Sequence, residues 1–207
     1  MDVMPTLRDI DHSQGPLSAA LSIMTYGSYQ CPQAGQAHKT TQELREALGD
    51  QLCLIFRHFP WPEKYPQAQT AAETAEAAGS QGKFWEMHNK LFDNQSALDE
   101  ASLVKYASEL GLEMSSFLHD ISQNVHTPRI RSDIESAADY GVEESPTFFI
   151  SVRHKGNSNL VSLVRQILVA TLAHSSEESL RTLAATPEDD PTDALTDDPA
   201  DAFEDSP

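Results

Sequence analysis

Short apolar runs alternate with longer stretches of helical composition along this chain. Residues 21–26 (LSIMTY) form the first apolar run, which predicts a buried strand. Residues from Pro32 to about Leu48 have helical composition, and Gly49 is suited to cap the end of that helix. Residues 51–59 (QLCLIFRHF) are apolar almost throughout, as is typical of a central strand covered on both faces. A strand, a helix and a strand within about 40 residues predict a βαβ unit.

The composition changes after this unit, because Ala, Glu, Gln, Leu and Lys dominate and strand-like runs disappear. We expect a helical insertion at about residues 66–140, with helices near residues 67–78, 83–92, 99–110, 114–121 and 127–140. Asp99 is suited to the N-cap of the third of these helices. A strand is predicted again at residues 147–152 (TFFISV), followed by a turn at 155–157. Apolar residues at helical spacing then predict a final amphipathic helix over 160–172.

This order predicts an α/β domain over residues 18–174, between two segments of different character. Residues 1–17 are polar and form an arm, either ordered or a loose lead-in. Residues 175–207 predict a disordered acidic tail. Nine of the acidic residues lie between 187 and 207, where there is no Lys, Arg or His, and removing this stretch changes the net charge from −18 to −9. So acidic a chain is expected to repel nucleic acid and anionic membranes.

Further features of the sequence bear on where the protein acts. No apolar run approaches the roughly 18 to 20 residues that span a bilayer. The start, MDVMPTLRDIDHSQGP, lacks the basic and apolar regions of a secretory signal. The chain has only two cysteines, Cys31 and Cys53, which is too few for a disulfide framework. We therefore expect a cytoplasmic protein in which a reactive thiol is catalytic or regulatory.

Cys31 carries the most informative chemistry, because it is followed by Pro32 and then by a predicted helix. Pro32 fits the first helical position, which places Cys31 at or beside the N-cap. The free backbone N–H groups and the dipole of a helix stabilise a thiolate there, and thiols so placed have pKa values lowered from about 8.5 to about 3.5–7.5. Such a sulfur is a nucleophile and a good leaving group. The alternative is that Cys31 is an ordinary buried residue at a helix start.

Four segments resemble the DsbA-like thiol–disulfide oxidoreductases of the thioredoxin superfamily. They occur in the family's order and span most of residues 11–172: DHSQGPLSAALSIMTYGSYQCPQAGQ, FRHFP, AAETAEAAGSQGKFWEMH and SPTFFI. The resemblance implies a thioredoxin-like fold, with the helical insertion between an N-terminal βαβ unit and a C-terminal ββα unit. It also implies that Cys31 is the attacking cysteine. Pro146 matches the family's cis-proline, so that Ser145, Pro146 and Thr147 would lie against Cys31 and bind extended substrate backbone.

The sequence departs from the family at the position of the resolving thiol. The family motif is Cys-Pro-x-Cys, whereas this chain has Cys31, Pro32, Gln33 and Ala34. Ala34 lies one helical turn beyond Cys31, where the second cysteine would release a mixed disulfide, and it has no thiol. Cys53 lies in the middle of a predicted buried strand, where we expect a small core residue rather than a redox partner. The family also carries an acidic residue where this chain has Ser28.

Other polar residues give weaker signals. Arg57 and His58 end the second predicted strand and are interpreted as a solvated strand end, although a cation near Cys31 would further stabilise a thiolate. The eight histidines are scattered without metal-ligand spacing, so the spacing predicts no metal site. His38 lies two turns after Cys31, too far to act as its base.

Three functions are compatible with these residues. The first is a monothiol oxidoreductase in which Cys31 attacks a protein or peptide disulfide, or a glutathionylated thiol. An external thiol such as glutathione, acting as co-substrate rather than bound cofactor, then releases the sulfur. The second is an inactive module that keeps the scaffold as a peptide-binding or regulatory surface. The third is glutathione-dependent transfer or isomerisation of small molecules. The first requires a sulfur that solvent can reach and that lies near Pro146; the oligomeric state stays open.

Overall fold

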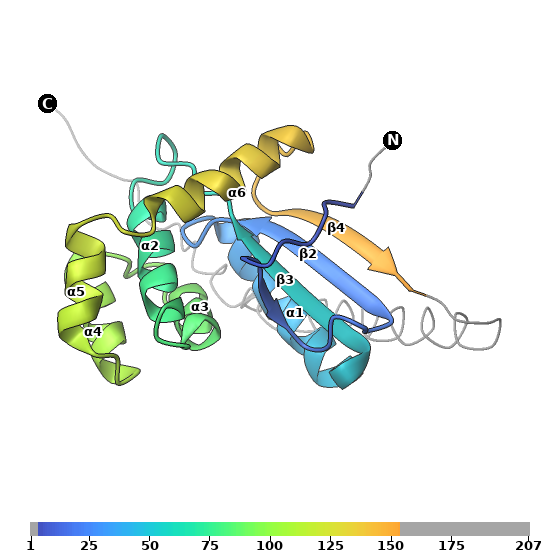
Figure 1. Ribbon diagram of the computed structural model, residues 1–207, viewed down its shortest axis with the longest axis horizontal. Helices are drawn as coiled ribbons and strands as arrows, with labels where there is room; N and C mark the ends of the chain where they lie inside the picture. The colour runs from blue at the N-terminus through green and yellow to red at the C-terminus, as the bar shows by residue number, and fades with distance from the viewer. Residues whose placement is uncertain (1–3, 154–207) are drawn as a thin grey trace, which may run out of the picture. The chain divides into compact units, whose positions relative to one another are not determined.

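The computed structural model describes residues 4–153, and Figure 1 shows how their elements are arranged. The strands are β1 (His12–Gln14), β2 (Leu21–Gly27), β3 (Leu52–His58) and β4 (Thr147–Val152). The helices are α1 (Pro32–Leu48), the short 3-10 helix η1 (Gly49–Gln51), α2 (Ala68–Gly79), α3 (Phe84–Asp93), α4 (Glu100–Glu109), α5 (Met114–Ser122) and α6 (Thr127–Asp139). The predicted turn at 155–157, the predicted helix over 160–172 and the acidic tail lie outside the described residues.

The four strands form one mixed sheet in the order β1-β3-β2-β4. β2 and β3 are parallel, from Leu21 opposite Leu52 to Gly27 opposite His58. α1 joins them, so the predicted βαβ unit is confirmed. β1 pairs antiparallel with β3, and β4 pairs antiparallel with β2. Every residue of β3 is buried, as its continuous apolar run predicted.

Helices cover both faces of this sheet (Figure 1). On one face, Leu48 of α1 packs with Leu21, Leu52 and Leu54. On the other face, Ala137 of α6 packs with residues of β2 and β3 that include Cys53. A third and larger apolar cluster holds α2–α5 together and includes Cys31 and Ala34 from the start of α1. The start of α1 therefore lies where the helical insertion meets the sheet.

The predicted helices lie close to those of the structure because their boundary residues act as expected. The side chain of Asp99 accepts a hydrogen bond from the Ser102 amide and caps α4. Gly49 ends α1 with a positive φ of 50°, and its amide donates to the Arg45 carbonyl. None of the helices within residues 4–153 is both long and apolar enough to cross a membrane.

The structure adds a strand that the sequence pattern did not predict. β1 is three residues long, lies within the N-terminal arm and pairs His12, Ser13 and Gln14 with β3. A segment this short has no hydrophobic alternation to reveal it. The arm is therefore ordered along β3, and it brings His12 and Asp11 over the end of β3 that carries Arg57 and His58.

Candidate active site

Cys31 occupies the N-cap of α1, as the Cys-Pro sequence predicted. Its backbone is extended, with φ −79° and ψ 119°, and Pro32 follows at the start of the helix. The Cys31 carbonyl accepts the first helical hydrogen bond from the Gly35 amide at 3.1 Å. No side chain caps this helix, so the sulfur is carried beside free amide groups of the first turn.

The Ser145–Pro146 turn lies directly against this sulfur. The peptide bond between Ser145 and Pro146 is cis, as the family resemblance implied. Cys31 Sγ lies 3.1 Å from the Ser145 carbonyl oxygen. The Ser145 hydroxyl accepts a hydrogen bond from the Ser28 amide at 3.0 Å, and Thr147 Oγ1 donates to the Glu144 carbonyl at 2.7 Å. Residues 114 positions apart in the sequence thus meet at one point.

The sulfur is much less accessible than a free nucleophile requires. Cys31 exposes 1% of its surface, which contradicts the expectation of a solvent-accessible thiol. The Ser145 carbonyl covers one side, and the Gln33 side-chain oxygen lies 3.3 Å from Sγ. Because Gln33 itself is exposed, its side chain can leave the sulfur without disturbing the core.

Ala34 and Cys53 lie as the sequence predicted, and neither is placed to resolve a disulfide. Ala34 is 3% exposed and lines a small cavity of about 30 Å³ together with His38, His88 and Phe92. Cys53 is fully buried in β3 and packs in a different apolar cluster from Cys31. Both cysteines are free, and burial raises the pKa of the Cys53 thiol. The interpretation of Cys53 as a small core residue is confirmed.

The side chains of Gln95 and His88 hold the turn that carries Cys31, and the sequence pattern did not predict their roles. The side-chain amide of Gln95 donates to the Tyr29 carbonyl at 2.7 Å and to the Cys31 carbonyl at 2.8 Å. A Cβ atom at Gly35 would come within 2.0 Å of the Gln95 side-chain oxygen, which shows how closely Gln95 packs on the first turn of α1. The Tyr29 hydroxyl hydrogen-bonds to His88 Nδ1 at 3.0 Å in the core. Burial lowers the pKa of His88 well below its usual value, so this pair is neutral.

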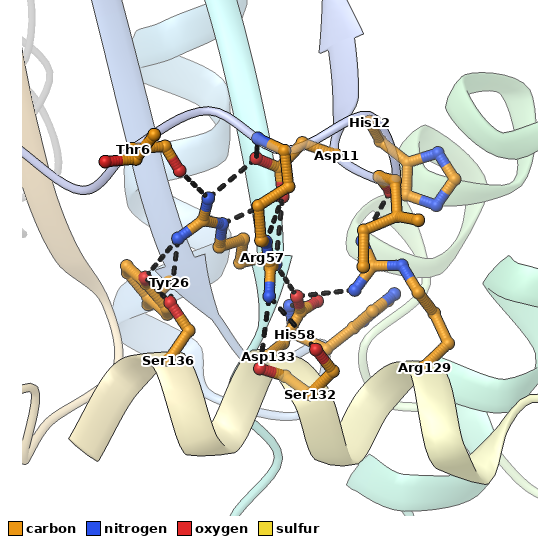
Figure 2. Close-up of polar contacts among 12 residues, drawn as sticks. Thr6, Asp11, His12, Tyr26, Arg57, His58, Arg129, Ser132, Asp133 and Ser136 are labelled. Atoms are coloured by element: carbon orange, nitrogen blue, oxygen red, sulfur yellow. Dashed lines mark hydrogen bonds and ion pairs between the residues drawn. The ribbon is translucent and has the colours of Figure 1, made fainter. Parts of the chain in front are cut away.

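Arg57 and His58 are buried in a polar network, so their interpretation as a solvated strand end is wrong. Figure 2 shows the Arg57 guanidinium enclosed by Thr6, Asp11, Tyr26 and Ser136. Arg57 is fully buried, and its guanidinium forms an ion pair with Asp11 at 2.7 Å. Burial alone would raise the pKa of Asp11, but hydrogen bonds from Arg57 and Arg8 outweigh it and lower that pKa. A cation in a strand covered on both faces must be paired, and this requirement could have predicted the burial of Arg57 from the sequence.

The same network continues along α6 through Asp133. Its carboxylate is fully buried, accepts a hydrogen bond from the His58 amide at 2.9 Å, and pairs with Arg8 and Arg129. The N-terminal arm, β3 and α6 are therefore joined by ion pairs (Figure 2). None of the hydrogen bonds or ion pairs found among residues 4–153 links these charges to Cys31 Sγ, so the network positions elements rather than the sulfur.

The mixed sheet with its helical insertion, together with a cysteine at a helix N-cap beside a cis-proline turn, defines a thioredoxin-like fold. A family model described as thioredoxin matches residues 8–168, and the chain belongs to that family. DsbA1 of Wolbachia pipientis has a similar structure, with a TM-score of 0.64 and 21% identity over 78% of this chain and 90% of that chain. The thiol–disulfide exchange protein DsbA2 of the same organism gives a TM-score of 0.60 and 17% identity, over 77% and 87% of the two chains.

A sequence relative is the Na⁺/H⁺ antiporter NhaA 1 of Salinispora arenicola. It is 38% identical over 162 residues, which make up 78% of this chain but 25% of the antiporter. This chain therefore spans about a quarter of the length of that relative. The match therefore carries no transport activity to this chain.

Proposed function

We propose that this protein exchanges disulfides through a single nucleophilic sulfur, that of Cys31. The observation that carries the proposal is the position of Cys31 Sγ at the N-cap of α1, 3.1 Å from the carbonyl that precedes cis-Pro146. A thiol in this position combines the electrostatic support of a helix start with an adjacent backbone segment. Ser145, Pro146 and Thr147 would bind the extended backbone of a protein or peptide substrate.

The reaction has two balanced steps. The Cys31 thiolate attacks one sulfur of a substrate disulfide, a new S–S bond forms, and the other substrate sulfur leaves as a thiolate that takes up a proton. An external thiol then attacks the substrate sulfur of the mixed disulfide and releases Cys31 as a thiolate. Glutathione is the external thiol that we propose, acting as co-substrate in a reducing cytoplasm. Because Ala34 has no thiol, the second step cannot occur within the motif.

Because the Cys31 sulfur is buried, a neighbouring group must move before a disulfide can reach it. A disulfide can approach in line only when the Gln33 side chain swings away from Sγ, or when the Ser145–Pro146 turn shifts. Gln33 is exposed and is held near Sγ by a single contact at 3.3 Å. We therefore assign Gln33 as a movable cover of the sulfur.

The same burial favours a second function, an inactive module that keeps the scaffold for binding peptides. In that case the Cys31 thiol donates its hydrogen bond to the Ser145 carbonyl permanently and serves only to hold the turn. A serine could replace the thiol in that role, because its hydroxyl donates a hydrogen bond as well.

The release of a coloured thiol from an aromatic disulfide distinguishes the two functions. We expect the native chain to release one thiol, Cys53→Ser to behave like the wild type, and Cys31→Ser to release none. Ala34→Cys is the matched variant for the second step: we expect it to expel a bound peptide thiol without added glutathione, whereas the wild type retains the mixed disulfide. If the wild type reacts only after denaturation, the inactive module is the better account.

A further inference from the structure

Three side chains from distant parts of the sequence converge beside the polar network. His12 belongs to β1, His58 to the end of β3 and Glu76 to α2. His12 Nε2 lies 2.9 Å and His58 Nε2 lies 2.8 Å from the same oxygen, Glu76 Oε1. All three donor atoms lie within 4.8 Å of one another. The three residues lie on three different elements, so their spacing along the chain does not reveal the cluster.

The donor set is one that divalent transition metals use. Two imidazole nitrogens and one carboxylate oxygen form a known zinc set, which leaves a fourth position for water or another ligand. Tetrahedral zinc with bonds of about 2.0–2.1 Å separates two ligand atoms by about 3.3 Å. The two His–Glu distances of 2.8 and 2.9 Å would open by about half an ångström in that geometry, and the two Nε2 atoms, which lie within 4.8 Å of each other, would lie about 3.3 Å apart. In the absence of a metal, the two Nε2 protons fill the place that the cation would take.

The surroundings already orient the two histidine ligands. The His12 ring stacks on Phe84 with the ring centroids 3.4 Å apart and the planes within 7°. The backbone of His58 is held by the hydrogen bond from its amide to Asp133, and its ring meets Phe84 edge to face. Fixed ring orientation of this kind is what outer-sphere partners supply in metal sites.

The charge balance of the site favours a cation. Glu76 is 7% exposed, and its carboxylate oxygen Oε1 is the atom that both imidazoles contact. The nearest guanidinium is that of Arg129, whose Nε lies 4.0 Å from Glu76 Oε1. Its positive charge is already shared with Asp133 through a direct ion pair. His58 is sealed from solvent, whereas the His12 side chain is 21% exposed and gives the route of entry.

We propose that His12, His58 and Glu76 form a binding site for one zinc-like divalent metal ion, which fastens the N-terminal arm to β3 and α2. The role that we assign to the ion is to join the three elements, and Cys31 belongs neither to this cluster nor to its immediate partners. A bound ion would replace two hydrogen bonds with three coordination bonds. Each imidazole would then carry its remaining proton on Nδ1.

The test uses zinc and cobalt ions on the full chain without an affinity tag, in a Cys31→Ser background so that the reactive thiol cannot bind metal. We expect one zinc ion per chain by calorimetry. Cobalt should give the intense visible absorption of a four-coordinate site with nitrogen and oxygen ligands. Zinc at 100 times its dissociation constant should raise the midpoint of thermal unfolding by about 5 °C or more.

The variant His12→Phe removes one ligand and keeps an aromatic ring to stack on Phe84. We expect its zinc affinity to fall by more than the roughly 10- to 100-fold that loss of an outer-sphere partner costs. His126→Phe is the matched control, because His126 pairs with Asp120 at 3.0 Å and belongs to no three-ligand cluster within residues 4–153. That variant should bind zinc like its parent. Both variants keep the acidic residues 187–207, so weak binding by that stretch cancels in the comparison.

Two results would overturn the proposal. One is the absence of stoichiometric zinc binding by the parent chain. The other is a His12→Phe variant that binds zinc as tightly as the parent. Should His12→Phe fail to fold, zinc-induced shifts of the ring nitrogen resonances in the parent chain decide the matter. We expect the Nε2 signals of His12 and His58 to move on binding, and unchanged signals would contradict the site.

Discussion

The sulfur site and the polar network beneath α6 are both buried, yet they are built from opposite kinds of contact. Cys31 Sγ touches one carbonyl and one exposed side-chain amide, at 3.1 and 3.3 Å. The Arg57 guanidinium, in contrast, makes five hydrogen bonds of 2.6–2.8 Å to four residues. The partners of a buried charge cannot be exchanged at small cost, because the loss of any one of them leaves a buried polar group unpaired. The sulfur's contacts can be exchanged at small cost, which suits a group that must form and break covalent bonds.

We expect the largest change in the free energy of unfolding at Arg57, in the polar network. Arg57→Met leaves the buried Asp11 carboxylate with Arg8 as its remaining cationic partner and should lower the free energy of unfolding by about 3–5 kcal/mol. Urea denaturation followed by circular dichroism measures this. Lys105→Met is the control, since Lys105 forms an exposed ion pair with Glu109 at 3.7 Å and should change stability by less than about 1 kcal/mol. Equal effects of the two substitutions would refute the assigned difference between network and surface.

A smaller change in stability is expected at Gln95, which lies beside the turn that carries Cys31. Gln95→Ala removes the donors to the Tyr29 and Cys31 carbonyls and should cost about 1–3 kcal/mol of stability. The substitution should also change the rate at which Cys31 reacts with an alkylating reagent. Gln123→Ala, at an exposed position, should change neither quantity. An unaltered alkylation rate in Gln95→Ala would mean that Gln95 does not position the turn.

The buried histidine behind Tyr29 predicts a dependence of stability on pH. Burial lowers the pKa of His88, so below about pH 6.5 the unfolded chain binds a proton that the native chain does not. Stability should therefore fall by about 1.4 kcal/mol for each pH unit below that point, and this loss should be absent above it. Urea titrations of the wild type and His88→Gln at pH 7 and pH 5.5 measure the difference. The same slope in both proteins would rule out His88 as its source.

The smallest effect is expected at the cover of the sulfur. Gln33→Ala removes the side chain that lies 3.3 Å from Sγ and should raise the alkylation rate of Cys31 a few-fold, with little change in stability. Gln36→Ala, one turn further along α1 and exposed, serves as the control. A rate unaffected by Gln33→Ala would place the barrier to access in the Ser145–Pro146 turn.

The sequence predicted the parts of this molecule that depend on local pattern. The alternation of apolar runs and helical stretches predicts β2, α1, β3 and β4, and Cys31 with Pro32 predicts a cysteine at a helix start. The contact between Cys31 and Ser145 came from the family resemblance, because no local pattern joins residues 114 positions apart. These are the features that the structure confirms.

The remaining features depend on long-range pairing. Arg57 and His58 read as a solvated strand end because their partners, Asp11 and Asp133, lie far away in the sequence. The arm hides a three-residue strand for the same reason. Burial of Cys31 was also not predicted, since it depends on how the 145–147 turn packs against α1. The one available signal was that Arg57 and His58 lie within an apolar strand, where buried polar groups need partners.

The proposed function requires that Cys31 forms a mixed disulfide while the chain is folded. Intact mass spectrometry after incubation with oxidised glutathione detects this mixed disulfide. We expect one glutathione adduct per chain, located at Cys31, absent from Cys31→Ser and removed by reduced glutathione. A native chain that remains unmodified while its denatured form takes up glutathione would refute the proposed function and leave a thioredoxin scaffold without thiol chemistry.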